Sequence, residues 1–228
     1  MTMRGDSRMI NIKPDFANAH SRANKILVTS NIISDFPYSA IDLVKEQSEI
    51  RCRTFKKALE YGVDIFSFGS ESAIIFKYNE KSIIFYDDEK PMNHVKFSIL
   101  HELGHLINGH DFLKKDSITY QKYEIETNYF AAQLLMPEQI LREIQKRGTR
   151  ITHEFLQNYF AVSYQAADKR IATLEKTNFE WWRSRTEREY DDIILLKYKN
   201  FLDIICPVRY DYNFEVEYSL QLERNSWY

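Results

Sequence analysis

The pentapeptide His101-Glu102-Leu103-Gly104-His105 restricts the fold of this chain more than any other segment. On an α-helix, residues i and i+4 lie on one face, so both imidazole rings can reach a single metal ion. Glu102 lies one step round the helix, where its carboxylate can contact a water molecule on that metal without binding the metal itself. This spacing is typical of zinc hydrolases. A chance match is the alternative in a chain with six histidines, so the hypothesis needs a third ligand.

One placement of the third ligand follows the metzincin pattern. There a glycine three residues after the second histidine breaks the helix, and the ligand follows three residues later. Asn108 and Asp111 hold those positions here, while Gly109 and His110 are each one step out of register. We interpret His110 as a capping or solvent-exposed residue rather than a ligand.

The other placement is an acidic residue on the following helix, as in gluzincins. Glu124 and Glu126 follow His105 by 19 and 21 residues. The inner face of that helix is otherwise apolar, and an unpaired buried carboxylate is costly, so a metal ion is a sufficient partner for it. The spacing favours this placement and leaves both carboxylates open as candidates.

Hydrophobic periodicity predicts the secondary structure around the motif. The metal-binding helix opens near Pro91 and ends near Gly109. Further helices are predicted over 15–30, 39–61, 119–136 and 138–147, and a hairpin over 73–78 and 82–87. Within that hairpin, the strand at 83–87 either offers an edge to an extended substrate or lies buried beneath the helix. Apolar residues at every even position from 210 to 222 predict a long strand, which with 193–198 and 201–205 forms a C-terminal β element.

Residues 152–176 read as two helices around a tight turn, with Ser163 as the N-cap of the second. The segment resembles a DNA-binding helix-turn-helix, although Ala161 stands where the turn usually has glycine. Acidic and basic side chains offset each other on the second helix, so it lacks the positive surface that DNA binding requires. We therefore interpret it as a helical hairpin that packs on the preceding domain.

Composition argues against several other classes of protein. The net charge of −2 gives the chain no general attraction to nucleic acid or acidic lipid. No apolar run reaches the roughly 18 residues of a membrane span, and the start lacks the apolar core of a signal peptide. Cys52 and Cys206 lie far apart and outside any Cys-x-x-Cys pattern, which favours reduced thiols. We expect a soluble, cytoplasmic protein.

The motif and the segment that follows it resemble the ImmA/IrrE family of metallo-endopeptidases. The family signature reads HELGH and then E-x-E-A-N-x-F-A-A-x-L-L-M-P, and residues 124–137 read EIETNYFAAQLLMP here. The likeness is close over 94–137, with Thr127 in place of the usual alanine. It implies that Glu126, which precedes the Ala-Asn pair of the signature, binds zinc together with His101 and His105. Glu124 is kept as the fallback ligand.

The resemblance also implies a function. One zinc ion per chain would lower the pKa of a bound water, and Glu102 would accept its proton and pass it to the leaving amine. The implied substrate is a specific protein, in the family typically a helix-turn-helix repressor or antitoxin encoded nearby on a mobile element, so cleavage relieves repression. The alternative is a non-proteolytic zincin-fold module that contacts a repressor or DNA.

These inferences together predict an α+β fold, a mostly helical zincin-like metalloprotease domain with a small β-sheet. We expect the metallopeptidase domain at 1–150, the helix-turn-helix-like segment at 151–180 and a β-rich extension at 181–228.

Overall fold

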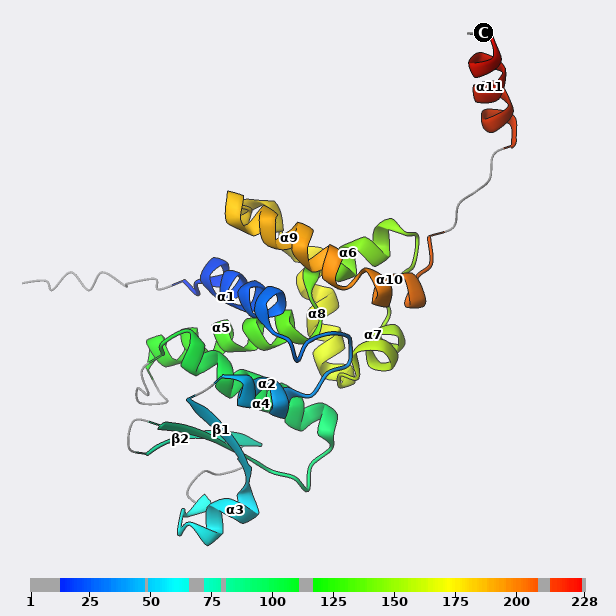
Figure 1. Cartoon of the computed structure of the whole chain (residues 1–228). Helices are drawn as coiled ribbons and strands as arrows, with labels where there is room; N and C mark the ends of the chain where they lie inside the picture. The colour runs from blue at the N-terminus through cyan, green and yellow to red at the C-terminus, as the bar shows by residue number, and fades with distance from the viewer. Residues whose placement is uncertain are drawn as a thin grey trace, which may run out of the picture.

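The computed structural model describes residues 13–47, 49–65, 72–78, 81–110, 117–208 and 214–226. It is an α+β structure in which helices gather on a small sheet (Figure 1). In chain order the elements are α1 (Phe16–Thr29), α2 (Ala40–Glu46), β1 (Ile50–Thr54), α3 (Phe55–Glu60), β2 (Ala73–Tyr78), β3 (Lys81–Tyr86), α4 (Met92–Ile107), α5 (Ile118–Leu135), α6 (Glu138–Lys146), α7 (His153–Phe160), α8 (Tyr164–Lys176), the 3₁₀ turn η2 (Phe179–Trp182), α9 (Arg185–Lys197), α10 (Lys199–Ile205) and α11 (Phe214–Asn225).

Helix α5 lies at the centre of the helical part, between α4 and α1 (Figure 1). Helix α4 packs against α5 on one side and against β2 and β3 on the other, and α9 packs against α1. Because α5 has a helix on each side, it buries residues on two faces: Phe130 lies against Gly104 of α4, and Tyr129 contacts His20 of α1. The metal-binding motif on α4 and the helix that follows it are therefore neighbours in the core.

The sheet has the strand order β1-β3-β2. Strands β2 and β3 form the predicted antiparallel hairpin, and β1 pairs with β3 in parallel. The hypothesis that residues 83–87 offer an edge to a substrate is wrong, because β3 is hydrogen-bonded on both sides. Its residues Ile84 and Phe85 are buried, as the alternative interpretation expected.

The single helix predicted over 39–61 is instead α2, β1 and α3. In β1, Cys52 points inward while Arg51 and Arg53 are exposed, which is the alternation of a half-buried strand. The parallel pairing with β3 supplies backbone hydrogen bonds from a distant segment, and such tertiary contacts override local helix propensity.

The predicted C-terminal β element is also wrong. Residues 193–197 and 201–205 lie in α9 and α10, and the part of the predicted strand that the structure describes, from Phe214, forms α11. Residues 210–213 lie outside the described residues. A strand needs a hydrogen-bonded neighbour, whereas a helix satisfies its backbone groups within itself. The Glu, Leu and Gln residues of this tail are also strong helix formers.

The other predicted helices are confirmed as α1, α4, α5, α6 and the pair α7 and α8. Gly109 and Gly148 follow α4 and α6 with positive φ angles, as helix-ending glycines do. The Ser163 hydroxyl accepts a hydrogen bond from the backbone N–H of Ala166, which makes it the N-cap of α8. Across the described ranges, no helix has both the length and the apolar character that crossing a membrane requires.

The hairpin of α7 and α8 is fixed to the rest of the structure by buried polar contacts. Arg170 of α8 is 1% exposed and donates a hydrogen bond to the Met136 carbonyl at 2.9 Å, and another to the Gln133 side chain. Lys96 of α4 donates to the Phe160 carbonyl at the end of α7, at 3.2 Å. These contacts support the interpretation of the segment as a hairpin that packs on the preceding helices.

The turn between α7 and α8 gives a test of local strain. Ala161 has φ +49° and ψ +50°, a left-handed conformation that costs an L-residue about 1–2 kcal/mol. We expect Ala161→Gly to raise the free energy of unfolding by about 0.5–1 kcal/mol, since the greater freedom of unfolded glycine offsets part of the relief. Urea denaturation would measure this. The matched control Ala172→Gly, inside α8, should instead lose about 1 kcal/mol. Equal losses in both variants would contradict the prediction.

Candidate metal centre

Two histidines of α4 and one carboxylate of α5 converge on a single point. The Nε2 atoms of His101 and His105 are 3.2 Å apart. The carboxylate oxygens of Glu124 lie 3.3 Å from the His101 Nε2 atom and 3.2 Å from the His105 Nε2 atom. The three donor groups lie within 4.8 Å of one another. Two imidazoles and one carboxylate are the donor set of catalytic zinc sites, so these residues fit a divalent metal ion.

The close approach of α4 and α5 at Gly104 creates this arrangement. A Cβ atom at Gly104 would lie 2.9 Å from the Phe130 Cδ1 atom and 3.3 Å from the Thr127 Cγ2 atom. The missing side chain therefore lets the two helices come together directly before His105 and about one turn after His101. The Thr127 hydroxyl lies 3.3 Å from the His101 Nε2 atom, on the same side of α5 as Glu124.

The structure does not bring Glu126, the ligand named by the resemblance, to the two histidines. Its Oε2 atom lies 3.0 Å from the Nε2 atom of His110, and its other oxygen accepts a hydrogen bond from the Asp15 backbone N–H. Residues two apart on a helix point about 200° apart, so only one of the two glutamates can face α4. Glu124 does so and Glu126 faces α1. The geometry therefore favours the fallback residue Glu124 as the third donor, and which of the two glutamates binds a metal stays a prediction.

His110 caps α4, since its backbone N–H donates to the His105 carbonyl at 3.0 Å, but its side chain is not solvent-exposed as the sequence suggested. It is 7% exposed, stacks on Tyr123 with ring centroids 3.9 Å apart, and places its Nδ1 atom 3.2 Å from the Nδ1 atom of His105. Burial, aided by the nearby His105, lowers the pKa of His110 to about 4, so the ring is neutral at neutral pH. A neutral imidazole has one donor and one acceptor nitrogen.

The contacts of His110 assign those two nitrogens. Glu126 takes the Nε2–H as acceptor, so the Nδ1 atom of His110 accepts from the Nδ1–H of His105. This tautomer leaves the Nε2 lone pair of His105 directed toward the metal-binding point. Glu126 and His110 therefore hold a metal-facing ring in orientation, as outer partners of metal-binding histidines do.

Asn128 gives His101 the equivalent support. Its Oδ1 atom lies 3.1 Å from the His101 Nδ1 atom, which leaves the Nε2 atom of that ring to face Glu124. Sequence reasoning assigned no role to Asn128. Its position four residues after Glu124, one helical turn further along the same face of α5, is the signal that would have found it.

The charge of Glu124 suits a metal ligand. Burial would raise its pKa, but the facing rings of His101 and His105 outweigh burial and hold that pKa well below its usual range. A hydrogen bond with Tyr120 acts in the same direction. Tyr123 stacks on His110, whereas His94 lies away from the site with its Nε2 atom 2.7 Å from the Ser72 hydroxyl.

Glu102 lies where the motif predicts, partly buried beside the metal-facing histidines. Its negative charge is one of the causes that raise the pKa of His101 against the opposing effect of burial. The metzincin placement receives no support, because Asn108 ends α4 in a right-handed conformation with φ −78°. Asp111 lies outside the described residues.

A comparison with protein-family models identifies the family. A peptidase family described as the IrrE N-terminal-like domain matches residues 58–172, about half of the chain. The chain belongs to this family. The match confirms the resemblance to ImmA/IrrE proteins, and its span includes α4, α5 and all three converging donors.

The matched span continues past residue 150 into α7 and α8. The division of the chain into three domains stays a prediction. No curated protein matches the chain.

The close crossing of α4 and α5 predicts the effect of adding one methyl group at Gly104. Gly104→Ala should lower the free energy of unfolding by about 1–2 kcal/mol, because overpacking against the buried Phe130 ring outweighs the higher helix propensity of alanine. Thermal and urea denaturation would measure the loss. Ser98→Ala, on the same helix but away from the crossing, is the control and should stay within about 0.5 kcal/mol of wild type. A Gly104→Ala protein as stable as the control would contradict the described contact.

The two glutamates predict different metal affinities. Glu124→Gln should weaken zinc binding more than about 100-fold, since it removes a charged donor, whereas Glu126→Gln should weaken it about tenfold through His110. Competition with a chromophoric chelator would give both values, and circular dichroism would verify folding. If Glu126→Gln caused the larger loss, the ligand named by the family signature would be correct and the placement of Glu124 would be wrong.

Proposed function

We propose that this IrrE N-terminal-like protein is a zinc-dependent endopeptidase. His101, His105 and Glu124 would hold one zinc ion, and Glu102 would act as general base and acid. The observation that carries the proposal is the convergence of three donors from α4 and α5 beside a further carboxylate on α4. Membership of a peptidase family supports the same conclusion independently.

Different residues of the chain have different roles in the proposed peptide hydrolysis. When bound, zinc supplies Lewis acidity toward the peptide carbonyl and lowers the pKa of a water molecule. Glu102 accepts a proton from the attacking water and returns it to the leaving amine. Asn128 and His110 keep the two imidazole rings in the orientation that presents their Nε2 atoms. Tyr120, hydrogen-bonded to Glu124, helps to keep that carboxylate ionised.

The substrate in this proposal is a specific protein, a helix-turn-helix repressor or antitoxin whose cleavage relieves transcriptional repression. The resemblance to ImmA/IrrE proteins supports this class of substrate, and a gene on a mobile element beside that of the substrate would suit it. We place the enzyme in the cytoplasm, where buried and unpaired thiols such as Cys52 and Cys206 stay reduced.

A substitution of the general base tests the enzyme. Glu102→Gln should bind zinc as wild type does and cleave about 10²–10⁴-fold more slowly, because it loses proton transfer and keeps all three donors. The assay would incubate each protein with the repressor or antitoxin encoded beside it and identify new termini by mass spectrometry.

Three results would count against the proposal in different ways. Undiminished cleavage by Glu102→Gln would exclude this mechanism. Cleavage that survives removal of zinc by a chelator would exclude the metal. A partner that the wild-type protein binds but never cleaves, with or without zinc, would instead favour the non-proteolytic binding module.

A further inference from the structure

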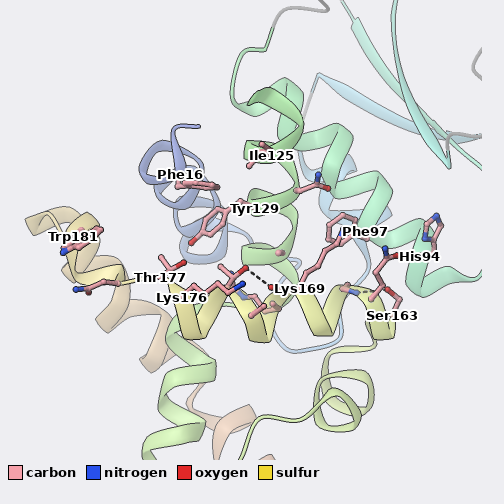
Figure 2. A pocket seen from close by; sticks show the side chains of 18 residues that line it. Phe16, His94, Phe97, Ile125, Tyr129, Ser163, Lys169, Lys176, Thr177 and Trp181 are labelled. Atoms are coloured by element: carbon pink, nitrogen blue, oxygen red, sulfur yellow. Dashed lines mark hydrogen bonds between the residues drawn. The ribbon is translucent and has the colours of Figure 1, made fainter. Parts of the chain in front are cut away.

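A groove of about 720 Å³ lies between α5 and α8, bounded by α4 and η2 (Figure 2). Its floor is built from small and apolar side chains, among them Phe97, Ala132 and Ala166. His94 lies at one end and Trp181 at the other, where the indole is 82% exposed. A large exposed aromatic beside an apolar floor is characteristic of a surface that binds another chain.

The charges around the groove have one sign. The residues that line it include no Asp or Glu, although the whole chain has a net charge of −2. Lys169 and Lys176 lie on the α8 side of the groove in Figure 2, and both are exposed. Neither lysine forms an ion pair within the part of the chain that the structure describes. The groove therefore has an apolar floor and a rim with two cations available to a partner.

The groove adjoins the metal centre along α5 at Asn128. Asn128 lines the groove and also contacts the His101 ring at 3.1 Å. Ile125, which is 46% exposed and lines the groove, directly follows Glu124 in the chain. A polypeptide segment seated in the groove therefore lies against α5, the helix that carries Glu124.

We propose that this groove binds an acidic amphipathic segment of the protein substrate. Apolar side chains of the segment pack on the floor and against Trp181, while its carboxylates face Lys169 and Lys176. This is the groove-binding mode in which a helix buries its apolar face. The proposal rests on the proposed peptidase function and adds to it the chemistry by which the substrate is chosen. The apolar floor offers nothing to a phosphate backbone, which favours a peptide over DNA.

The experiment measures binding by the full chain with Glu102→Gln, so that a bound peptide is not cleaved. Three fluorescein-labelled helical peptides share one leucine face and carry Glu, Gln or Lys on the polar face. By fluorescence anisotropy the Glu peptide should bind about tenfold more tightly than the Lys peptide, because two charge pairs at a partly screened surface give a difference of this order. Added salt should reduce that difference.

Charge reversal in the groove should reverse the preference. Lys169→Glu with Lys176→Glu should favour the Lys peptide, whereas Lys25→Glu with Lys146→Glu, a matched pair of exposed helical lysines elsewhere, should keep the original order. Ala166→Trp should weaken the Glu and Gln peptides alike by filling the floor. Thermal denaturation would verify that each variant is folded.

Three outcomes would overturn the proposal. The first is equal binding of the Glu and Lys peptides, and the second is an order of affinities that the groove variant leaves unchanged. The third is a short DNA duplex that binds more tightly than any peptide and whose binding is lost in the groove variant. Peptide binding should persist when a chelator removes zinc. A protein that selects the Glu peptide but never cleaves its substrate would therefore contradict the proposed peptidase function and leave the proposed groove binding standing. Normal cleavage without charge selection would refute the groove alone.

Discussion

The close crossing of α4 and α5 is the constraint on which the rest of the site depends. Gly104 has no side chain to keep the helices apart, and the buried Phe130 ring fills the space beside it. At this separation a glutamate side chain from α5 reaches two imidazoles on α4. The sheet beneath α4 and the helix α1 behind α5 hold the pair together from both sides. Much of the fold therefore serves to fix one interhelical distance.

Helix α5 uses its two faces for two related tasks. The face toward α4 carries Glu124 and Asn128, which lie against the metal-facing histidines. The face toward α1 carries Glu126, whose buried carboxylate orients His110 and through it His105. Two glutamates separated by one residue thus act on the same centre from opposite sides, one directly and one through an intervening ring. This explains why an acidic residue at each position suits the chain.

Local signals predicted most of the helices, the hairpin and the motif, because spacing, caps and end glycines act within a few residues of one another. Which of Glu124 and Glu126 faces α4 could not be predicted, since α5 is buried on both faces and its pattern does not tell which face meets α4. His110 was misjudged because its partner Glu126 comes from another helix. The predictions for β1 and for the tail were wrong for opposite reasons. Pairing with the distant strand β3 places Ile50–Thr54 in the sheet. The alternating residues of the tail, in contrast, have no neighbouring strand among the described residues.

Helix α8 separates attachment from recognition. Ala167 and Arg170 are buried and anchor it, although Arg170 also borders the groove, while Lys169, Thr173 and Lys176 line the groove from its more open side. Substitution of Lys169, Thr173 and Lys176 leaves the buried residues of α8 and the donor residues on α4 and α5 unchanged. Duplicated genes with this architecture can therefore diverge in the proteins they recognise while they inherit the same hydrolytic chemistry.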